Sequence, residues 1–297
     1  MSKYVIINAD DFGMCNAANR AVEELFECGG ITSSTIMAPC AWSYDAVKFA
    51  AAHPEYAIGI HLTTTSEWGT YRWAPVNQNN TASLRDEEGF MWHESDQFEE
   101  NCDLDEVKGE IIAQIEKLKS LGLNPSHFDN HMGSLYGIYK GRTEILEATL
   151  GICALYGMPF RIPAKFTDAQ MNNETLDINI PREMIDAIFD KINEATTMLK
   201  IATPDFLMPG EWNGSQSESF ENYKKYIYDL YASFEDGVTE TYIHPAKECD
   251  ELKAITGSWQ RRVWEYELFK DPETRKYFES IGLKLINYRD LKELRGY

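Results

Sequence analysis

The chain has 297 residues, of which 43% are hydrophobic and 26% charged, as is ordinary for a globular protein of one large domain or two small ones. Its formal net charge of −20 makes a nucleic-acid partner unexpected, because nucleic-acid-binding proteins carry basic patches. The six cysteines include no C-x-x-C pair, which argues against a structural zinc site or a disulfide framework and favours a reducing compartment.

No apolar stretch approaches the roughly 18 residues that a membrane-spanning helix needs. The first residues, MSKYVIINADD, lack the apolar core of a secretory signal. We therefore expect a cytoplasmic protein without a membrane partner. The sequence leaves the oligomeric state open, and a homodimer is compatible with it.

Short apolar runs alternate with amphipathic stretches through the first part of the chain. Residues 66–103 interrupt this rhythm, because they are rich in Trp, Asn, Gly and Ser and have little periodicity. A long insertion of this kind is often a binding loop or a lid. The expected strands are 4–9, 31–37 and 57–65, and the expected helices are 16–27, 43–52 and 105–121.

The same alternation continues to the end of the chain. The expected strands are 125–132, 158–163, 204–209, 237–246 and 284–291, and the expected helices are 144–156, 182–198, 219–235 and 259–278. About eight strands alternating with helices predict a parallel α/β architecture. No glycine-rich phosphate loop follows the first strand, so a distorted (β/α) barrel is favoured over a doubly wound sheet. We expect a single domain over residues 1–297.

Polar residues fall at the ends of the predicted strands, where barrels carry their chemistry. Asp10 and Asp11 follow the first strand directly. Carboxylate and imidazole groups together suit a divalent metal such as Zn²⁺. The alternative is a polar patch that is open to solvent. The further candidates at strand ends are His61, His127, Asp129, His131, Arg161, Asp205 and His244.

Five of these candidates have a specific local context. Strand alternation predicts that His127, Asp129 and His131 share one face. His244 precedes Pro245, which fixes the backbone, and an imidazole facing a metal site could act as a general acid. Arg161 lies in the apolar context MPFRIP, where a guanidinium could orient a carboxylate.

Four segments together resemble a known family. They are NADDFGMCNAANRAV, ITSSTIMAPCAWSYDAVKFA, GIHLTTT and HFDNHM, and they are similar to segments of the YdjC-like (ChbG/HpnK) carbohydrate deacetylases. That family resembles the NodB-type polysaccharide deacetylases in fold and site. The resemblance implies a distorted (β/α) barrel and metal-dependent hydrolysis of the acetamide of N-acetylated sugars such as chitooligosaccharides.

The resemblance also implies roles for individual residues. Asp11, His61 and His131 would bind a divalent metal ion, with Mg²⁺ and Zn²⁺ both open. Asp10 would be the general base, and Arg161 would hold it. His244 would be the general acid. His127 and Asp129 are expected beside the substrate or behind the metal ligands.

Three departures from the common family pattern leave the substrate open. Cys15 stands where the family commonly has serine, HLTTT replaces HLTLT, and MGSLYG follows HFDNH where many members carry further histidines.

Aromatic residues could stack on sugar rings or could instead pack on the barrel or across a dimer interface; they are Trp68, Tyr71, Trp73, Trp92 and Trp212. Two other functions remain possible alternatives: a metal-dependent barrel hydrolase acting on another amide or a phosphoester, and a sugar-binding protein without catalysis.

Overall fold

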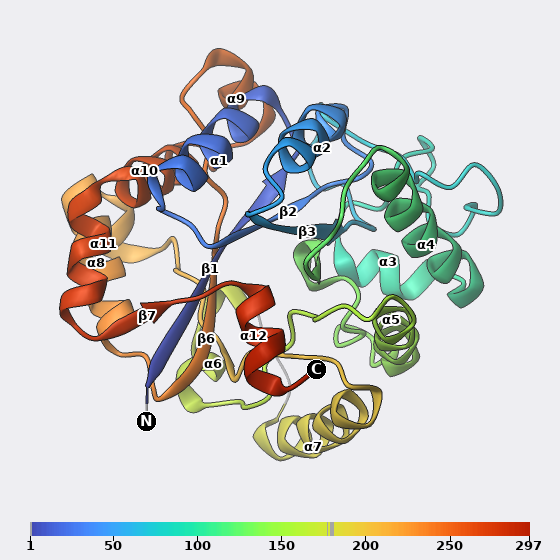
Figure 1. Cartoon of the computed structure of the whole chain (residues 1–297). Helices are drawn as coiled ribbons and strands as arrows, with labels where there is room; N and C mark the ends of the chain where they lie inside the picture. Colours follow the sequence, from blue (N-terminus) through green and yellow to red (C-terminus); the bar gives the residue numbers. More distant parts are fainter. Residues whose placement is uncertain (1, 177, 179–180) are drawn as a thin grey trace.

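A curled sheet of parallel strands forms the centre of the molecule (Figure 1). The computed structural model describes residues 2–176, 178 and 181–297. Within these residues the sheet has seven strands, in the order β4-β3-β2-β1-β6-β5, with β7 beside β1. The strands are β1 (Lys3–Phe12), β2 (Ser33–Ile36), β3 (Ala57–Leu62), β4 (Phe128–Asn130), β5 (Phe206–Leu207), β6 (Gly237–Ile243) and β7 (Leu283–Leu285).

The central strand is β1, which is buried from Val5 to Phe12. It pairs with β6 from Lys3 to Ala9, with β2 from Asn8 onwards, and with β7 over its first three residues. A parallel strand that is covered on both faces needs a nearly continuous apolar run, and VIINA provides one. This strand was expected over residues 4–9, but it extends to Phe12 and so includes both aspartates.

The segment expected as a fifth strand, residues 158–163, makes only an isolated bridge. Phe160 pairs with Phe128 of β4, and the Phe160 amide donates to the carbonyl of Ala202 at 3.1 Å. Pro159 and Pro163 lack the N–H group that a ladder needs, so the pairing cannot extend. The segment nevertheless lies between β4 and β5, where it completes the curve of the barrel.

Helices surround the sheet in Figure 1. Their inward faces are apolar, as the buried Val107, Ile111 and Ile115 of α4 illustrate. The helices are α1 (Asn16–Cys28), α2 (Ser43–Ala52), α3 (Ser95–Asn101), α4 (Leu104–Ser120), α5 (Thr143–Tyr156), α6 (Asp168–Met171), α7 (Arg182–Leu199), α8 (Phe220–Ala232), α9 (Asp250–Ile255), α10 (Trp259–Lys270), α11 (Pro272–Ser280) and α12 (Tyr288–Arg295).

Two sequence expectations near the carboxyl end were wrong. The helix expected over 259–278 is divided into α10 and α11, because Asp271 caps a new helix that begins at Pro272. The strand expected over 284–291 ends at Leu285, since Asn287 caps α12 by accepting from the amides of Arg289 and Asp290. Local capping groups outweighed the apolar pattern in both cases.

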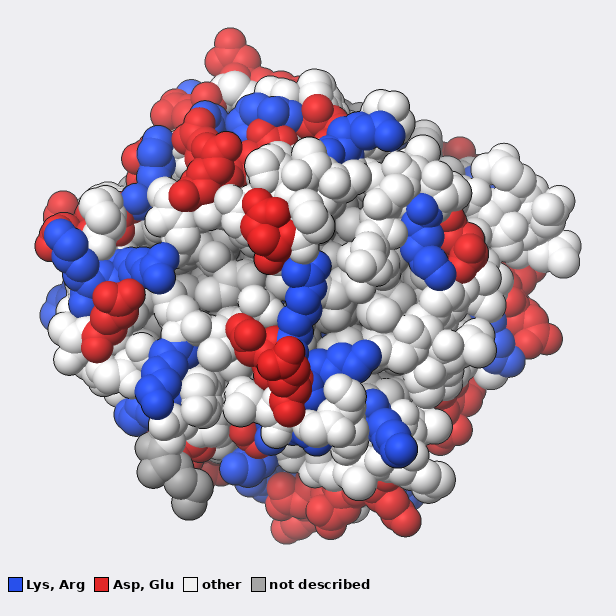
Figure 2. All heavy atoms as spheres, viewed as in Figure 1, with Lys and Arg blue, Asp and Glu red and all other residues white. Residues whose placement is uncertain are grey.

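The expected fold class is confirmed as a single curled parallel sheet enclosed by helices, a distorted (β/α) barrel. None of the helices in the described residues is both long and apolar enough to cross a membrane. Acidic and basic side chains are interspersed on the face shown in Figure 2, and neither sign covers it continuously.

Candidate active site

The two adjacent aspartates reach the same cavity because β1 contains a bulge. Ala9 pairs with Ser34 and Phe12 pairs with Ile36, so β1 advances three residues while β2 advances two. Asp11 itself has a φ of 63°, in the left-handed region that non-glycine residues seldom adopt. The extra residue brings Asp11 to the cavity that Asp10 also lines.

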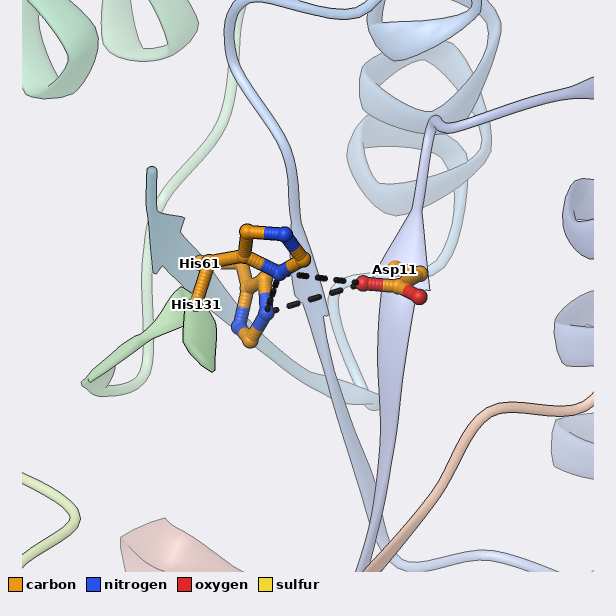
Figure 3. A group of neighbouring side chains, drawn as sticks. All are labelled: Asp11, His61 and His131. Carbon is orange, nitrogen blue, oxygen red and sulfur yellow. Dashed lines mark hydrogen bonds and ion pairs between the residues drawn. The ribbon is translucent and has the colours of Figure 1, made fainter. Parts of the chain in front are cut away.

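Asp11, His61 and His131 point at one another from three parts of the barrel (Figure 3). Asp11 Oδ1 lies 3.6 Å from His61 Nε2 and 3.7 Å from His131 Nδ1, and the two nitrogens are 3.3 Å apart. All three side chains are buried, and Asp11 Oδ1 has no hydrogen-bond partner. A buried carboxylate oxygen without a donor, facing two imidazole nitrogens, fits a divalent cation such as Zn²⁺.

Each of these three side chains is held on its other polar atom by a further group of the chain. This arrangement turns the remaining atoms toward a common point and selects one tautomer for each imidazole. The contacts are Arg262 Nη2 donating to Asp11 Oδ2 at 2.7 Å, His61 Nδ1 donating to Asp129 Oδ1 at 2.8 Å and His131 Nε2 donating to Glu67 Oε2 at 2.9 Å.

Asp10 is held by Arg161 through two parallel hydrogen bonds. Nη1 donates to Oδ2 and Nη2 donates to Oδ1, each at 2.7 Å. Asn8 Nδ2 also donates to Oδ1, at 2.8 Å. Arg161 contacts two more buried carboxylates, Glu240 through Nε at 2.7 Å and Asp129 through Nη2 at 2.9 Å. Its guanidinium is therefore the positive centre of a buried acidic network.

The electrostatic environment favours a cation at the three-residue site. Burial opposes the charged form of His61, yet Asp129, Asp10 and Asp11 raise the pKa of His61 to about 9. Burial also opposes the charged form of Asp11, but Arg262 and the nearby histidines hold the pKa of Asp11 well below its usual range. Positive charge is thus stabilised next to an ionised carboxylate.

His244 follows the last residue of β6 and also lines the cavity. Its backbone amide donates to Glu265 Oε2 at 2.6 Å, which fixes the chain just before Pro245. Burial lowers the pKa of His244 below its ordinary value, although Asp11 acts in the opposite direction. A lowered pKa makes the protonated imidazole a stronger acid.

The cavity that these groups line has a volume of about 320 Å³. Its aromatic walls are Tyr136, Tyr139 and Tyr242, and no tryptophan among the described residues lines it. Trp73 is instead buried, with Nε1 donating to the carbonyl of Thr65 at 2.8 Å. Of the two roles left open for Trp73, stacking on a sugar or packing on the barrel, these contacts favour packing.

The other tryptophans are also engaged by protein groups. The guanidinium of Arg262 lies over the ring of Trp68, with Cζ 5.5 Å from the ring centroid. Trp212 packs edge-on against Tyr223 and Trp264, with ring centroids 5.5 and 5.2 Å apart. These contacts correspond to the packing alternative rather than to an open stacking surface.

Two sequence candidates lie away from the cavity. His127 is deeper in the barrel, stacked on Tyr288 of α12 with ring centroids 3.7 Å apart, and burial lowers the pKa of His127 to about 3. Asp205 lies at the amino end of the sheet, where its Oδ2 accepts from the amide of Val238 at 2.8 Å. Because Val238 is the second residue of β6 and His244 follows the end of that strand, Asp205 is at the wrong end of the strands for this site.

Asp129 and His131 also differ from a simple strand arrangement. Asp129 lies behind His61, which it orients, and does not line the cavity. His131 follows β4 and begins a short 3₁₀ turn in which Met132 has a φ of 53°. Because β4 ends at Asn130, His131 does not share a strand face with His127 and Asp129 as the sequence predicted.

Sequence reasoning missed several supporting residues. Arg262 and Glu67 carried no signal, since one is a charged residue within a helix and the other lies in an aperiodic insertion. Glu240 did carry one, because a carboxylate in the middle of a buried parallel strand requires a partner. Arg161 supplies that partner, together with the hydroxyl of Tyr288.

Comparison with known proteins places the site in context. A carbohydrate deacetylase from Enterococcus faecalis is 28% identical over 293 residues, covering 98% of both chains. A chitooligosaccharide deacetylase from Yersinia enterocolitica is 24% identical, covering 98% of this chain and all of that protein. A crystal structure of a putative cellobiose-phosphate cleavage protein from Enterococcus faecalis superimposes with a TM-score of 0.75 at 28% identity, covering 98% of this chain and 99% of the other.

The family comparison covers nearly the whole fold, including both aspartates, the two histidines that face Asp11, and His244. The sequence profile of the YdjC-like proteins matches residues 4–280. The chain therefore belongs to the YdjC-like family.

Proposed function

We propose that this protein is a carbohydrate deacetylase that uses a divalent metal ion to hydrolyse the acetamide of N-acetylated sugars, with chitooligosaccharides as the first substrates to test. The observation that carries the proposal is the bulge at Asp11, which brings two carboxylates to one cavity beside two histidines. The names of the relatives support the sugar amide as the bond that is cleaved.

Asp11, His61 and His131 would hold the metal ion through Oδ1, Nε2 and Nδ1, the three atoms that face one another. Imidazole ligands favour Zn²⁺ and its transition-metal neighbours over Mg²⁺. A bound ion of this kind would polarise the acetyl carbonyl and lower the pKa of a water molecule.

Asp10 is the proposed general base. Its carboxylate lines the cavity, and its two hydrogen bonds with Arg161 fix its orientation. A carboxylate has lone pairs left after accepting such bonds, so Asp10 can still take a proton from the attacking water. Arg161 thus holds the base in place through these two hydrogen bonds without itself moving a proton.

His244 is the proposed general acid for the departing amine. Amide cleavage expels a poor leaving group, so the sugar nitrogen must gain a proton as the C–N bond breaks. His244 lines the same cavity as Asp10 and is held by the Glu265 contact to its backbone. The products are acetate and a sugar with a free amino group.

The test is an acetate-release assay on N-acetylglucosamine oligomers with chelator-treated protein. Activity should disappear with chelation and return when Zn²⁺, Co²⁺, Mn²⁺ or Mg²⁺ is added singly. A phosphorylated disaccharide in the same panel tests the phosphoester alternative. Release of phosphate, or absence of acetate with every metal, would overturn the proposal.

A further inference from the structure

We propose that Glu67 is a positioning residue for His131, and that the insertion at residues 66–103 is a structural part of the metal site. This inference rests on the proposed function, because it assigns Glu67 a task toward the metal ligands. It also gives the insertion a different task from the sugar-binding or lid role expected from its composition.

The geometry selects one tautomer of His131. Nε2 lies 2.9 Å from Glu67 Oε2, and a carboxylate oxygen can only accept, so Nε2 carries the proton. Nδ1 is then left with its lone pair, and it is the nitrogen that lies 3.7 Å from Asp11 Oδ1. Without Glu67, either nitrogen of His131 could carry the proton, and the ligand atom would be protonated in part of the population.

His131 needs a partner from outside the sheet. The equivalent partner of His61 is Asp129, which lies directly opposite it on the neighbouring strand β4. His131 has left β4 and entered the 3₁₀ turn, so the strand register supplies no opposing residue for it. The insertion provides the missing carboxylate.

The segment that carries Glu67 is itself held in place. The amide of Ser66 donates to the carbonyl of Trp92 at 2.8 Å, and Ser66 Oγ accepts from the amide of Trp73 at 3.1 Å. Arg72 is buried and donates to Asp86 Oδ2 at 2.7 Å. Glu67 is thus anchored by a network that ties residue 66 to residues 73–92.

The insertion also contacts the site through its aromatic side chains. Trp73 packs edge-on against the His131 ring, with centroids 5.9 Å apart. Trp68 lies under Arg262, the residue that holds Asp11. Two of the three ligand side chains therefore depend on contacts from this one segment, which is why we assign it to the frame of the site.

The test measures metal binding directly, without any substrate. Glu67→Leu removes the acceptor, Glu67→Gln keeps one acceptor oxygen, and Glu87→Gln is the matched control at an exposed position of the same insertion. Zn²⁺ and Co²⁺ are titrated into each chelator-treated protein. We expect Glu67→Leu to weaken binding about 10- to 100-fold and Glu67→Gln to weaken it less, with Glu87→Gln unchanged.

Two spectroscopic readouts distinguish positioning from a general loss of structure. The visible spectrum of bound Co²⁺ should change in Glu67→Leu, because the orientation of one imidazole changes. The ¹⁵N shifts of His131 in the metal-free chain should report a single Nε2–H tautomer in the natural protein and a mixture in Glu67→Leu. Glu67→Gln should lie between them, because an amide can either accept from Nε2 or donate to it.

Unchanged metal affinity and an unchanged His131 tautomer in Glu67→Leu would overturn the inference. A rise in KM alone, with metal binding intact, would do the same by showing that Glu67 contacts the sugar. If metal affinity falls as expected but no acetylated sugar is hydrolysed by the natural protein, the proposed function fails while this inference stands.

Discussion

Arg161 joins Asp10 to the interior of the barrel across 151 positions of sequence, through a guanidinium that contacts three buried carboxylates. The same side chain thereby links a reactive group to the stability of the core. We therefore expect a substitution of Asp10 to affect catalysis and a substitution of Arg161 to affect the stability of the fold.

Asp10→Asn should abolish turnover while metal binding is retained. An amide cannot accept the proton of the attacking water, but it preserves the shape of the side chain. We expect kcat to fall by about 10² to 10⁴, the range typical of a lost general base. Acetate release measures the loss, and calorimetric titration with Zn²⁺ measures metal binding. Full turnover in this variant would contradict the assignment of the base.

Arg161→Gln should destabilise the fold by about 3–5 kcal/mol, because it leaves Asp10, Asp129 and Glu240 without their buried cation. The free energy of unfolding in urea measures this effect. Arg182→Gln is the control, since Arg182 pairs with Asp168 and Asp186 on an exposed surface and should cost less than about 1 kcal/mol. Equal losses in the two variants would argue against a central role for Arg161.

Asp11→Ala and His131→Ala should each lose the metal ion. A metal that binds only the folded chain raises its unfolding free energy by about 2.7 kcal/mol when present at 100 times its dissociation constant. Thermal unfolding with and without Zn²⁺ should therefore show a shift in the natural protein and none in either variant. His53→Ala, which changes a partly exposed imidazole paired with Glu55, serves as the control and should keep the shift.

His244→Ala should impair cleavage according to the leaving group. A sugar amine must be protonated as it departs, whereas an electron-poor arylamine needs less assistance. We expect a loss of about 10² to 10⁴ in kcat on N-acetylglucosamine oligomers and a smaller loss on an acetylated nitroaniline. Equal losses on both substrates would indicate that His244 acts in another step.

His127 should make the protein less stable in acid. Its pKa is lowered from an ordinary 6.5 to about 3 in the fold, so below pH 6.5 the unfolded chain binds a proton that the folded chain does not. Its contribution is fully present above pH 6.5 and is lost as the pH falls toward 3, at about 1.4 kcal/mol per pH unit.

The variant His127→Phe can keep the stacking on Tyr288 but cannot take up this proton. Urea unfolding of both proteins between pH 7 and 4 should give a shallower loss of stability in the variant. Parallel curves would show that His127 does not titrate differently in the two states.

The fold class and the candidate site residues at strand ends could be predicted from the sequence because they depend on local signals. Runs of β-branched residues predicted β1 and β3, and the polar residues at their ends identified Asp11 and His61. Arg262 could not be found in this way, since it comes from α10 and meets Asp11 only through tertiary packing. Glu67 was hidden for a related reason: an aperiodic insertion has no register from which a contact can be inferred.

The errors in secondary structure have a shared physical cause. Residues 284–291 have an apolar pattern that suits a strand, but the side chain of Asn287 satisfies the free amides of a helix start. Tyr288 is consequently carried into the barrel by α12, where its hydroxyl meets Glu240. The helix α12, which was predicted as a strand, therefore supplies Tyr288 to the buried network around Arg161.

The bulge in β1 has a consequence for how such sites can be recognised. Val5, Ile7, Ala9 and Phe12 all pack into the layer between the sheet and the helices, so the spacing of outward residues is two, two and then three. The longer spacing leaves two positions between Ala9 and Phe12 instead of one, and the acidic pair occupies them. A three-residue spacing of buried apolar residues across paired carboxylates is thus a sign of the bulge in the sequence. It can be searched for in any barrel sequence before a structure exists.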